Sequence, residues 1–455
     1  MTRPPTYLRI ESALPGAVWP AIPEPNRAAV LAVLQQLEQS QWLPPDRLRE
    51  LQLEQLTALI RHAWRTVPYY RAAWREFYDP TAPLTTAQFF RLPVVTRSAL
   101  QGNFGELCST HPPVSHGMPE QASSSGSTGM PVRFLQTELT KLIWHALTLR
   151  DHLWHRRDLG GTLAIVRRET QRGGTDNWGP ATAGLIRTGP TVTNTIREDA
   201  ASLLDWLRST DADYLLTYPS LVRDMAKVSI AQDVALPRLR EVRTIAEALD
   251  PELRELSRRA WNAPVVDLYS ASETGYLALQ CPEHAHYHVQ SEGVLLEVLN
   301  ESGAACGPGE VGRVVVTTLH NFATPLVRYD VGDFAEVGEP CPCGRGLPVL
   351  KRIVGRVRNS LVTRDGKRYW PAFGMITLGK IAPIRQHQFV QKSFDLVEAR
   401  FVLDTPLTPE QESRYLHHMQ AQLPPGMRIA IAYVDRIERS ASGKFEDLVS
   451  EVSAL

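Results

Sequence analysis

Short runs of β-branched and apolar residues alternate with longer segments of helical period through the middle of the 455-residue chain. The runs TLAIVRR, DYLLTYPS and PVVDLYS have the length and composition of buried strands. Helical segments separate them, and this order is typical of an α/β protein with a parallel or mixed sheet. Nearer the N-terminus, apolar residues at helical spacing predict an amphipathic helix over residues 48–67, and Thr96 is expected to cap another helix.

The pattern changes twice in the second half of the chain. GVLLEVLN and VGRVVVTTL have the period of strands and are joined by a glycine-rich turn, which indicates a β-rich subregion. The last hundred residues contain DLVEARFVL, TPEQESRYLHHMQAQL and MRIAIAYVDRI, which predict strand, helix and strand. We therefore expect a large N-terminal α/β domain with several sheets over residues 1–355 and a small α+β domain over residues 356–455.

Composition narrows the class of protein. Hydrophobic residues make up 43% of the chain and charged residues 22%, as in ordinary soluble globular proteins. The 49 basic and 49 acidic residues balance, so neither nucleic acid nor an anionic membrane is favoured as a partner. The first twenty residues lack the apolar core of a secretory signal, and no stretch approaches the roughly 20 apolar residues that span a bilayer. A cytoplasmic location is expected.

A serine- and glycine-rich stretch, SSSGSTGMPVRF, has the composition of a phosphate-binding loop. Its backbone amides and hydroxyls could donate hydrogen bonds to an anion, although such runs also serve as flexible linkers. It contains no lysine, unlike a Walker-type loop, so the balancing cation would have to come from elsewhere. The candidate phosphate-binding residues are Ser124, Ser125, Gly126, Ser127, Thr128 and Gly129.

Three further stretches contain candidate acids and a base. In DLYSASETGY an apolar strand ends in a small-residue loop whose only acid, Glu273, could hold Mg²⁺ against phosphate or be a solvated loop carboxylate. In PLVRYDVGDFAEV, Asp330 and Asp333 are expected on a turn after a strand, where a carboxylate could accept the ribose hydroxyls, although Asp-Gly turns are common for local reasons. In RSASGKFEDL, Lys444 follows a Ser/Gly turn, and a lone lysine is usually a surface charge.

The order of these four stretches, with VGRVRN between the third and the fourth, resembles the acyl-adenylating superfamily of acyl-CoA synthetases, adenylation domains and luciferases. Within it, the chain is most similar to the phenylacetate-CoA ligase-like branch. The resemblance covers nearly the whole chain. It implies that the Ser/Gly loop binds the phosphates of ATP, Asp333 binds ribose, and Arg356 contacts ribose or phosphate. It also implies an adenine and magnesium loop formed by Ser270, Ala271, Ser272, Glu273 and Thr274.

The resemblance also implies a mechanism. Lys444, on a mobile small domain, would stabilise the charge that develops as a carboxylate attacks the α-phosphate of ATP, with Mg²⁺ held by Glu273. The small domain would then rotate about a hinge and guide a thiol to the acyl-adenylate. The hinge position is Arg358, where the family usually has an aspartate, so the second half-reaction is less firmly implied than the first. Tyr218 and Glu247 are placed near the acyl pocket, and Glu247 could alternatively be a helix-start carboxylate.

Clustered cysteines suggest a metal. Cys281, His288, Cys341 and Cys343 supply three thiolates and an imidazole, the set expected for a closed, structural Zn²⁺ site. His284 or His286 could replace His288. The alternative is a group of reduced, unliganded residues in two surface turns.

The expected activity is that of a ligase which activates a carboxylic acid, of aromatic type, and transfers it to coenzyme A. A carrier-protein thiol or an amine could instead be the acceptor, and a non-catalytic nucleotide-binding relative is the other class that we consider. The expected cofactors are ATP, Mg²⁺, structural Zn²⁺ and coenzyme A. The expected partners are the acid and either coenzyme A or a carrier protein. Neither nucleic acid nor a membrane is expected, and the chain could form a homodimer.

Overall fold

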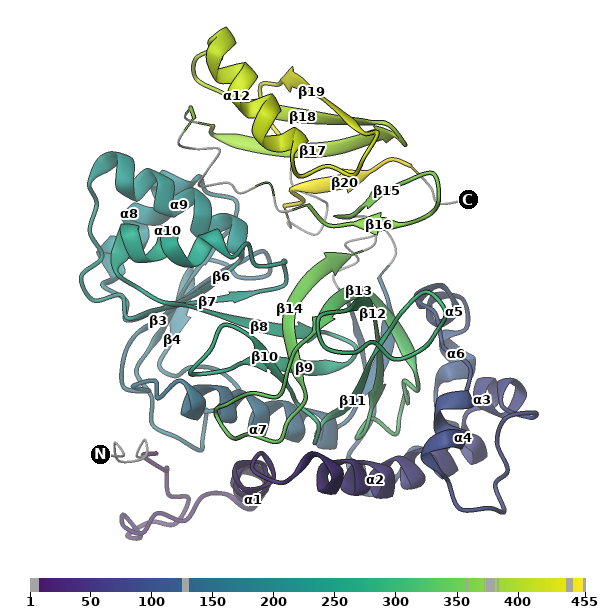
Figure 1. The fold of residues 1–455 in the computed structure, drawn as a ribbon. Helices are drawn as coiled ribbons and strands as arrows, with labels where there is room; N and C mark the ends of the chain where they lie inside the picture. The colour runs from purple at the N-terminus through teal and green to yellow at the C-terminus, as the bar shows by residue number, and fades with distance from the viewer. Residues whose placement is uncertain are drawn as a thin grey trace.

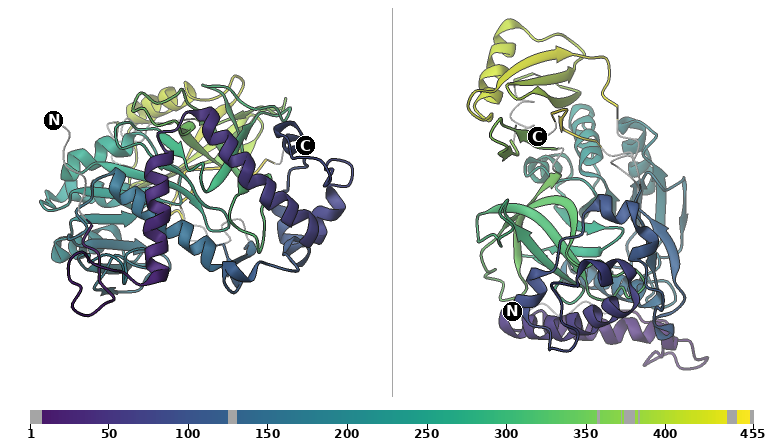
Figure 2. Two further views of the ribbon diagram at one scale, coloured as in Figure 1. Left: turned by 90° about the horizontal axis from the view of Figure 1, so that it is seen from below. Right: turned by 90° about the vertical axis from the view of Figure 1, so that its right-hand side faces the viewer.

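The computed structural model of the chain describes residues 8–124, 131–356, 359–371, 373, 381–382, 384–438 and 445–452. Figure 1 shows a large α/β body with a smaller α+β unit above it. The side view in Figure 2 shows the same division. Within the described part of the chain, we find no helix of sufficient length and apolarity to traverse a lipid bilayer.

A twelve-stranded mixed sheet forms the centre of the large domain, in the order β11-β12-β13-β14-β10-β9-β8-β7-β6-β3-β5-β4. Strands β5, β3, β6, β7 and β8 are parallel, and the remaining pairs are antiparallel. The strands are β3 (Leu163–Arg167), β4 (Gly173–Thr175), β5 (Thr191–Thr195), β6 (Tyr214–Thr217), β7 (Glu241–Ile245), β8 (Val265–Ala271), β9 (Gly275–Gln280), β10 (Tyr287–Val289), β11 (Val294–Leu299), β12 (Val311–Thr318), β13 (Tyr329–Val337) and β14 (Val349–Arg356). The β-branched runs seen in the sequence are β3, β6 and β8, as expected.

Helices cover both faces of the parallel half of the sheet, as its two-sided burial requires. One face packs against α8 (Ala200–Thr210), α9 (Pro219–Gln232) and α10 (Glu252–Trp261). The other packs against α1 (Pro25–Ser40) and α7 (Glu138–Trp154). The view from below in Figure 2 shows α1 and the long helix α2 (Pro45–Thr66) crossing the underside of the body. Helix α2 is the predicted amphipathic helix, and it buries Leu56, Leu59, Ile60 and Ala63.

The β-rich subregion does not form a separate sheet, because β14 pairs with β10 and joins the antiparallel strands to the parallel ones. A second apolar core lies between these strands and the N-terminal helices. These helices include α3 (Pro68–Ala73), α4 (Thr86–Arg91), α5 (Arg97–Gly102) and α6 (Phe104–Leu107). Thr96 caps α5 as predicted, since its side chain accepts a hydrogen bond from the Ala99 amide. The short helix η1 (Val114–His116) precedes a hairpin of β1 (Glu120–Ser123) and β2 (Arg133–Gln136).

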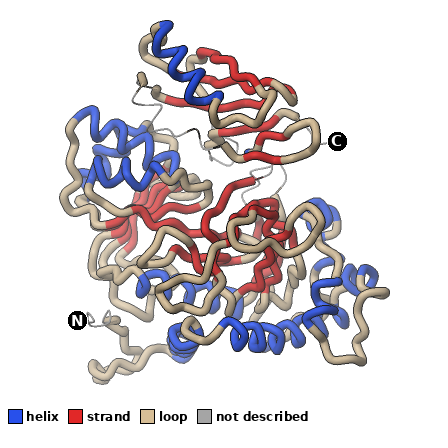
Figure 3. Tube along the Cα trace, viewed as in Figure 1, coloured by secondary structure: helices blue, strands red, loops and turns tan. Residues whose placement is uncertain are grey.

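The small domain has its own four-stranded sheet and its own apolar core. The predicted strand, helix and strand are β18 (Leu396–Val402), α12 (Pro409–Gln420) and β19 (Arg428–Tyr433). Strands β17 (Gln386–Ser393) and β20 (Leu448–Ser450) complete the sheet, and β15 (Leu361–Val362) pairs with β16 (Arg368–Tyr369) beside it. Figure 3 shows this sheet standing apart from the large one. The two sheets are therefore separate layers of the structure.

Candidate active site

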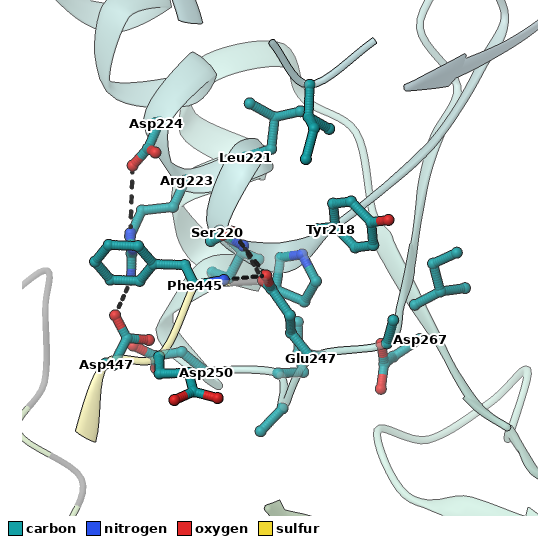
Figure 4. A pocket seen from close by; sticks show the side chains of 18 of the residues that line it. Tyr218, Ser220, Leu221, Arg223, Asp224, Glu247, Asp250, Asp267, Phe445 and Asp447 are labelled. Carbon is teal, nitrogen blue, oxygen red and sulfur yellow. Dashed lines mark hydrogen bonds and ion pairs between the residues drawn. The ribbon is translucent and has the colours of Figure 1, made fainter. Parts of the chain in front are cut away.

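A cavity of about 1810 Å³ lies at the carboxyl ends of the parallel strands, beneath the small domain. The residues that follow β6, β7 and β8 line it, including Tyr218, Glu247 and Ser272. Phe389 and Phe445 of the small domain line its opposite wall. Figure 4 shows one end of this cavity, with the Glu247 carboxylate directed at the segment that contains Phe445 and Tyr218 on the other side of Glu247. The carboxyl edge of a parallel sheet is where open α/β folds bind ligands, so the cavity is the candidate site.

The predicted adenine and magnesium loop is a tight hairpin between β8 and β9. Ser270 and Ala271 end β8, and Ser272, Glu273 and Thr274 form the turn before β9 begins at Gly275. Gly275 has a φ of 86°, a backbone conformation that side chains disfavour, so a glycine here allows the chain to reverse. The turn buries the Glu273 carboxylate, which retains only 6% exposure at the cavity wall.

Glu273 is paired with Arg97, a residue that the motif comparison does not point to. The Arg97 guanidinium lies 3.2 Å from Oε1 of Glu273 and donates a 3.3 Å hydrogen bond to the Ser124 hydroxyl. The Tyr329 hydroxyl donates to the same Glu273 oxygen at 3.2 Å. Burial, together with the Glu273 carboxylate, raises the pKa of Tyr329, so its hydroxyl remains a donor. Arg97 thus lies beside Ser124, the first residue of the predicted phosphate-binding loop, which contains no lysine.

One local signal could have identified Arg97. It is the first residue of α5, where the helix macrodipole favours acids and disfavours cations. A cation in this position therefore suggests a partner outside the helix, and here the partner is Glu273.

Ser124 joins the two ends of the predicted phosphate-binding loop by hydrogen bonds to Val132. Its amide donates to the Val132 carbonyl at 2.8 Å, and its hydroxyl accepts from the Val132 amide at 2.9 Å. These bonds extend the β1–β2 hairpin up to the start of the loop. The other predicted phosphate-binding residues, Ser125, Gly126, Ser127, Thr128 and Gly129, lie outside the described residues.

Asp333 lies inside strand β13 and not on a turn after a strand, which corrects the expectation for it and for Asp330. The Asp-Gly signal is explained by an irregular register between β12 and β13, with Gly332 at a φ of 80° donating its amide to Asp330. Asp333 pairs across the ladder with Arg356 of β14. Its carboxylate accepts from the Tyr269 hydroxyl at 3.0 Å and from Arg356 Nε at 3.3 Å.

Arg356 lines the cavity and is held there by its ion pair with Asp333. Burial alone would lower the pKa of Arg356, but the Asp333 and Glu273 carboxylates have the larger combined effect, so its pKa is raised. Both Asp333 and Arg356 line the cavity, on the side of the Glu273 hairpin. The predicted ribose and phosphate residues are thus brought together by two adjacent strands.

Aromatic side chains form the far wall of the cavity. Trp144 and Tyr276 have ring centroids 4.7 Å apart, and the Tyr276 hydroxyl lies 3.2 Å from the Thr148 hydroxyl. Trp178 lies farther along the same wall, with its ring 5.1 Å from that of Tyr214. Tyr218 is buried, and its hydroxyl accepts from the Arg168 amide at 3.3 Å. The cavity lining thus combines aromatic rings with polar side chains such as Thr148 and His152.

A buried ionic network supports this wall. Arg157 bonds to Asp151 at 2.6 Å and to Glu241 at 2.7 Å, and Arg243 bonds to Asp151 at 2.7 Å. Two acids and two arginines balance in charge, which lessens the cost of burying them. Arg243 also lines the cavity, so this network supplies its polar edge. The network joins two segments, residues 151–157 and strand β7, which lie more than 80 residues apart in the sequence, so local patterns do not reveal it.

Helix α9 of the large domain contacts the small domain directly. Lys227 donates to the Ile384 carbonyl at 3.2 Å, and Arg223 pairs with Asp447 at 2.9 Å. Burial lowers the pKa of Lys227 to about 8. Asp447 also lies 2.9 Å from His387, and the pKa of Asp447 is lowered because these two partners outweigh its burial. The predicted catalytic Lys444 and hinge Arg358 lie outside the described residues.

The predicted metal ligands converge at the opposite end of β9 and β10. Single donor atoms of Cys281, His286, His288 and Cys341 all lie within 4.8 Å of one another. Cys343 Sγ lies 3.4 Å from His288 Nε2, so it remains beside the cluster. Five donor residues are thus available for an ion that takes four. His286, which the sequence suggested as a substitute for His288, lies in the cluster together with it.

The protonation of these residues suits a metal ion. Burial and the nearby Arg345 guanidinium lower the pKa of His288 to about 4, so its imidazole is neutral and able to ligate. Burial raises the pKa of Cys341 to about 12, so in the absence of a cation it remains a thiol. Nε2 of His286 is buried and makes no hydrogen bond within the described part of the chain. These residues fit Zn²⁺, which accepts imidazole nitrogen and stabilises thiolates.

Comparison with known proteins agrees with this geometry. The family model for the CapK C-terminal domain matches residues 366–451. The phenylacetate-coenzyme A ligase of Thermus thermophilus is 25% identical over 342 residues, which are 72% of this chain and 74% of that protein. The chain is thus similar to phenylacetate-coenzyme A ligases over about 70% of its length.

Solved structures confirm the predicted fold. A 2-hydroxyisobutyryl-CoA ligase in its postadenylation state, in complex with R3-HIB-AMP, has a TM-score of 0.72 and 18% identity, over 91% of this chain and 92% of that chain. The same ligase in its thioesterification state, with 2-HIB-AMP and CoA, has a TM-score of 0.57 and 19% identity, over 91% of each chain. The mixed α/β fold with a C-terminal domain is therefore that of an adenylate-forming ligase.

Proposed function

We propose that this chain joins a carboxylic acid to coenzyme A through an acyl-adenylate. A carboxylate oxygen of the acid attacks the α-phosphorus of ATP, and pyrophosphate leaves. The thiol sulfur of coenzyme A then attacks the acyl carbon, AMP leaves, and the thiol proton passes to solvent. The observation that supports this best is the meeting of Ser124, Arg97, Glu273, Asp333 and Arg356 at one cavity wall.

Each of these side chains has a proposed task. Asp333 would accept the ribose hydroxyls, because a carboxylate is an acceptor with two oxygens. Arg97 and Arg356 would contact phosphate oxygens, where positive charge offsets the charge of the migrating group. Glu273 is the proposed ligand of Mg²⁺, which when bound would neutralise phosphate charge; its buried position beside Ser124 fits that role. Lys444 is the proposed catalytic cation of the first half-reaction.

The two domains are proposed to act in turn. Residues 1–355 would bind ATP and the acid, and residues 356–455 would carry Lys444 in the first half-reaction and the thiol-guiding surface in the second, with Arg358 as the hinge. Support comes from the contacts of α9 with the small domain and from the higher TM-score against the postadenylation state.

The acid is proposed to be aromatic. Trp144, Trp178, Tyr218 and Tyr276 line one wall, and aromatic rings pack well against a flat ring. Arg243 at the edge of this wall favours an acid that also bears a polar substituent. The relatives named phenylacetate-coenzyme A ligase agree with this class of acid.

The cysteine and histidine cluster is proposed to hold a structural Zn²⁺. It lies on β10 and on the loops beside β9 and β14, so it would tie these strands together at one end of the sheet. All its donors come from the protein, which leaves no coordination position for substrate. Its role would thus be stability and not chemistry.

A screen of acids tests the proposed function. The parent protein is incubated with ATP, Mg²⁺ and aryl, hydroxyaryl, aminoaryl or fatty acids, with and without coenzyme A, and pyrophosphate and thioester are measured. We expect pyrophosphate with aryl acids and thioester only when coenzyme A is present. A Glu273→Gln variant of equal fold is the control and should lose both signals.

Two other outcomes would redirect the proposal. Pyrophosphate release without thioester would indicate a carrier-protein thiol or an amine as the acceptor. ATP binding without pyrophosphate release for any acid would favour a non-catalytic nucleotide-binding protein, a class kept in view because the matched family model is that of CapK over residues 366–451.

A further inference from the structure

Glu247 holds the segment of the small domain that directly follows Lys444. Its Oε1 accepts the Phe445 amide hydrogen at 2.9 Å. The amide in question joins residues 444 and 445, so this bond fixes the peptide next to the proposed catalytic lysine. Figure 4 shows the carboxylate placed between Phe445 and the start of α9.

The Glu247 carboxylate is itself held firmly by the large domain. Its Oε2 accepts the Ser220 amide at 3.0 Å, and its Oε1 accepts the Ser220 hydroxyl at 3.1 Å, both in the first turn of α9. The preceding residue, Ala246, has a φ of 69°, a strained conformation for a residue with a side chain. It lies in a tight turn closed by a 2.9 Å hydrogen bond from the Glu247 amide to the Ile245 carbonyl, directly before the carboxylate that bonds to Ser220.

A second contact fixes the same segment two residues later. Arg223 of α9 pairs with Asp447 at 2.9 Å, and its guanidinium lies 5.3 Å from the centroid of the Phe445 ring. Figure 4 shows Arg223 between Asp224 and Asp447, with the Phe445 ring against it. The segment from 445 to 447 is thus held at its backbone by Glu247 and at its side chains by Arg223.

We propose that Glu247 is a positioning residue for adenylation, which acts by holding the amide of Phe445, the residue that follows the proposed catalytic Lys444 in the chain. The inference rests on the proposed function and goes beyond it, because it assigns a residue of the large domain to the first half-reaction only. When the small domain turns for thioester formation, the segment would leave Glu247, and the carboxylate would have no part in that step.

A helix-capping role alone would give a different result. Glu247 also satisfies an amide in the first turn of α9, and loss of that bond would lower stability without selecting a half-reaction. Asp199 offers the matched control, since its side chain caps α8 by accepting the Ser202 amide at 2.9 Å. An Asp199→Ala variant should lose thermal stability while keeping both half-reactions.

The experiment separates the two half-reactions in Glu247→Ala, in the isosteric Glu247→Gln and in Asp199→Ala. Adenylation is followed as acid-dependent pyrophosphate release, and thioester formation starts from synthetic acyl-AMP and coenzyme A. For Glu247→Ala we expect kcat of adenylation to fall about 100-fold, the effect of a misplacement of roughly 1 Å, with KM for ATP nearly unchanged. Glu247→Gln, which keeps one acceptor oxygen, should show a smaller loss, and thioester formation should match the parent.

Hydrogen–deuterium exchange gives a readout that does not depend on activity. A peptide that begins several residues before Phe445 and spans it should show the Phe445 amide exchanging at least about tenfold faster in Glu247→Ala than in the parent, because a hydrogen-bonded amide is protected. In Asp199→Ala its exchange should not change. Equal loss of both half-reactions in Glu247→Gln, or unchanged adenylation together with unchanged exchange, would overturn the inference. A parent protein that releases no pyrophosphate would instead refute the proposed function, while the exchange data would still decide whether Glu247 holds Phe445.

Discussion

Replacing Asp333 with alanine should weaken ATP binding by about 100-fold. Hydrogen bonds to a charged group contribute roughly 1.5–3 kcal/mol each, and two ribose hydroxyls are involved. The lower end applies, because Tyr269 and Arg356 already bond to the two carboxylate oxygens and share their lone pairs. Two bonds at the lower end give about 3 kcal/mol, and each 1.4 kcal/mol is tenfold in Kd.

Titration calorimetry with ATP and Mg²⁺ in the absence of acid measures this change. Tyr269→Phe is the matched control, since it removes one supporting hydrogen bond and leaves the carboxylate and Arg356 in place. We expect the control to weaken binding by less than about tenfold, in line with a single hydrogen bond. A folded Asp333→Ala protein with the parent's Kd would refute the assignment of this carboxylate to ribose.

Four further predictions follow from the site. Lys444→Ala should abolish adenylation while leaving the Kd for ATP nearly unchanged, because the lysine acts in the transition state; unchanged pyrophosphate release would remove it from the mechanism. Arg358→Pro should stop thioester formation while ATP–pyrophosphate exchange continues, and equal loss of both would place the pivot elsewhere. Elemental analysis should find about one Zn²⁺ per chain, and chelation should lower Tm before it affects adenylation; metal-free protein purified without chelators would refute the site. Lys227→Met should raise Tm at pH 7, because burial depresses the folded pKa of Lys227 to about 8. The advantage of the variant should shrink between pH 8 and 10.5, since the parent gains stability as its buried lysine loses its proton in that window. A difference in Tm that does not change with pH would contradict this.

Local patterns predicted the parallel strands because β3, β6 and β8 are short runs of apolar and β-branched residues. Glu273 was singled out from sequence as an acid in a small-residue loop after a strand, and the structure places it at the cavity wall. Asp333 was expected on a turn but lies within β13, because the segment 330–333 forms an irregularity inside the ladder and not its end.

Long-range partners could not be predicted in the same way. Arg97 meets a glutamate 176 residues away, and Glu247 meets an amide 198 residues away. Only the packing of the two domains and of the N-terminal helices brings these atoms together. The cysteine and histidine cluster also depends on distant segments, since Cys341 lies 60 residues beyond Cys281, and the sequence alone left open which of His284, His286 and His288 would join them.

Strand β14 pairs with β10 only at Val349 and Leu350, and with β13 from Leu350 to Arg356, its last residue. The end of β14 cannot slide along β13 without breaking the ladder that aligns Arg356 with Asp333. A displacement of the small domain that keeps this pair intact must therefore be absorbed after Arg356. The stretch that connects the domains can consequently change in length or stiffness during evolution, which would alter how far and how fast the small domain moves. The proposed nucleotide contacts of Asp333 on β13 and Arg356 on β14 would be unaffected.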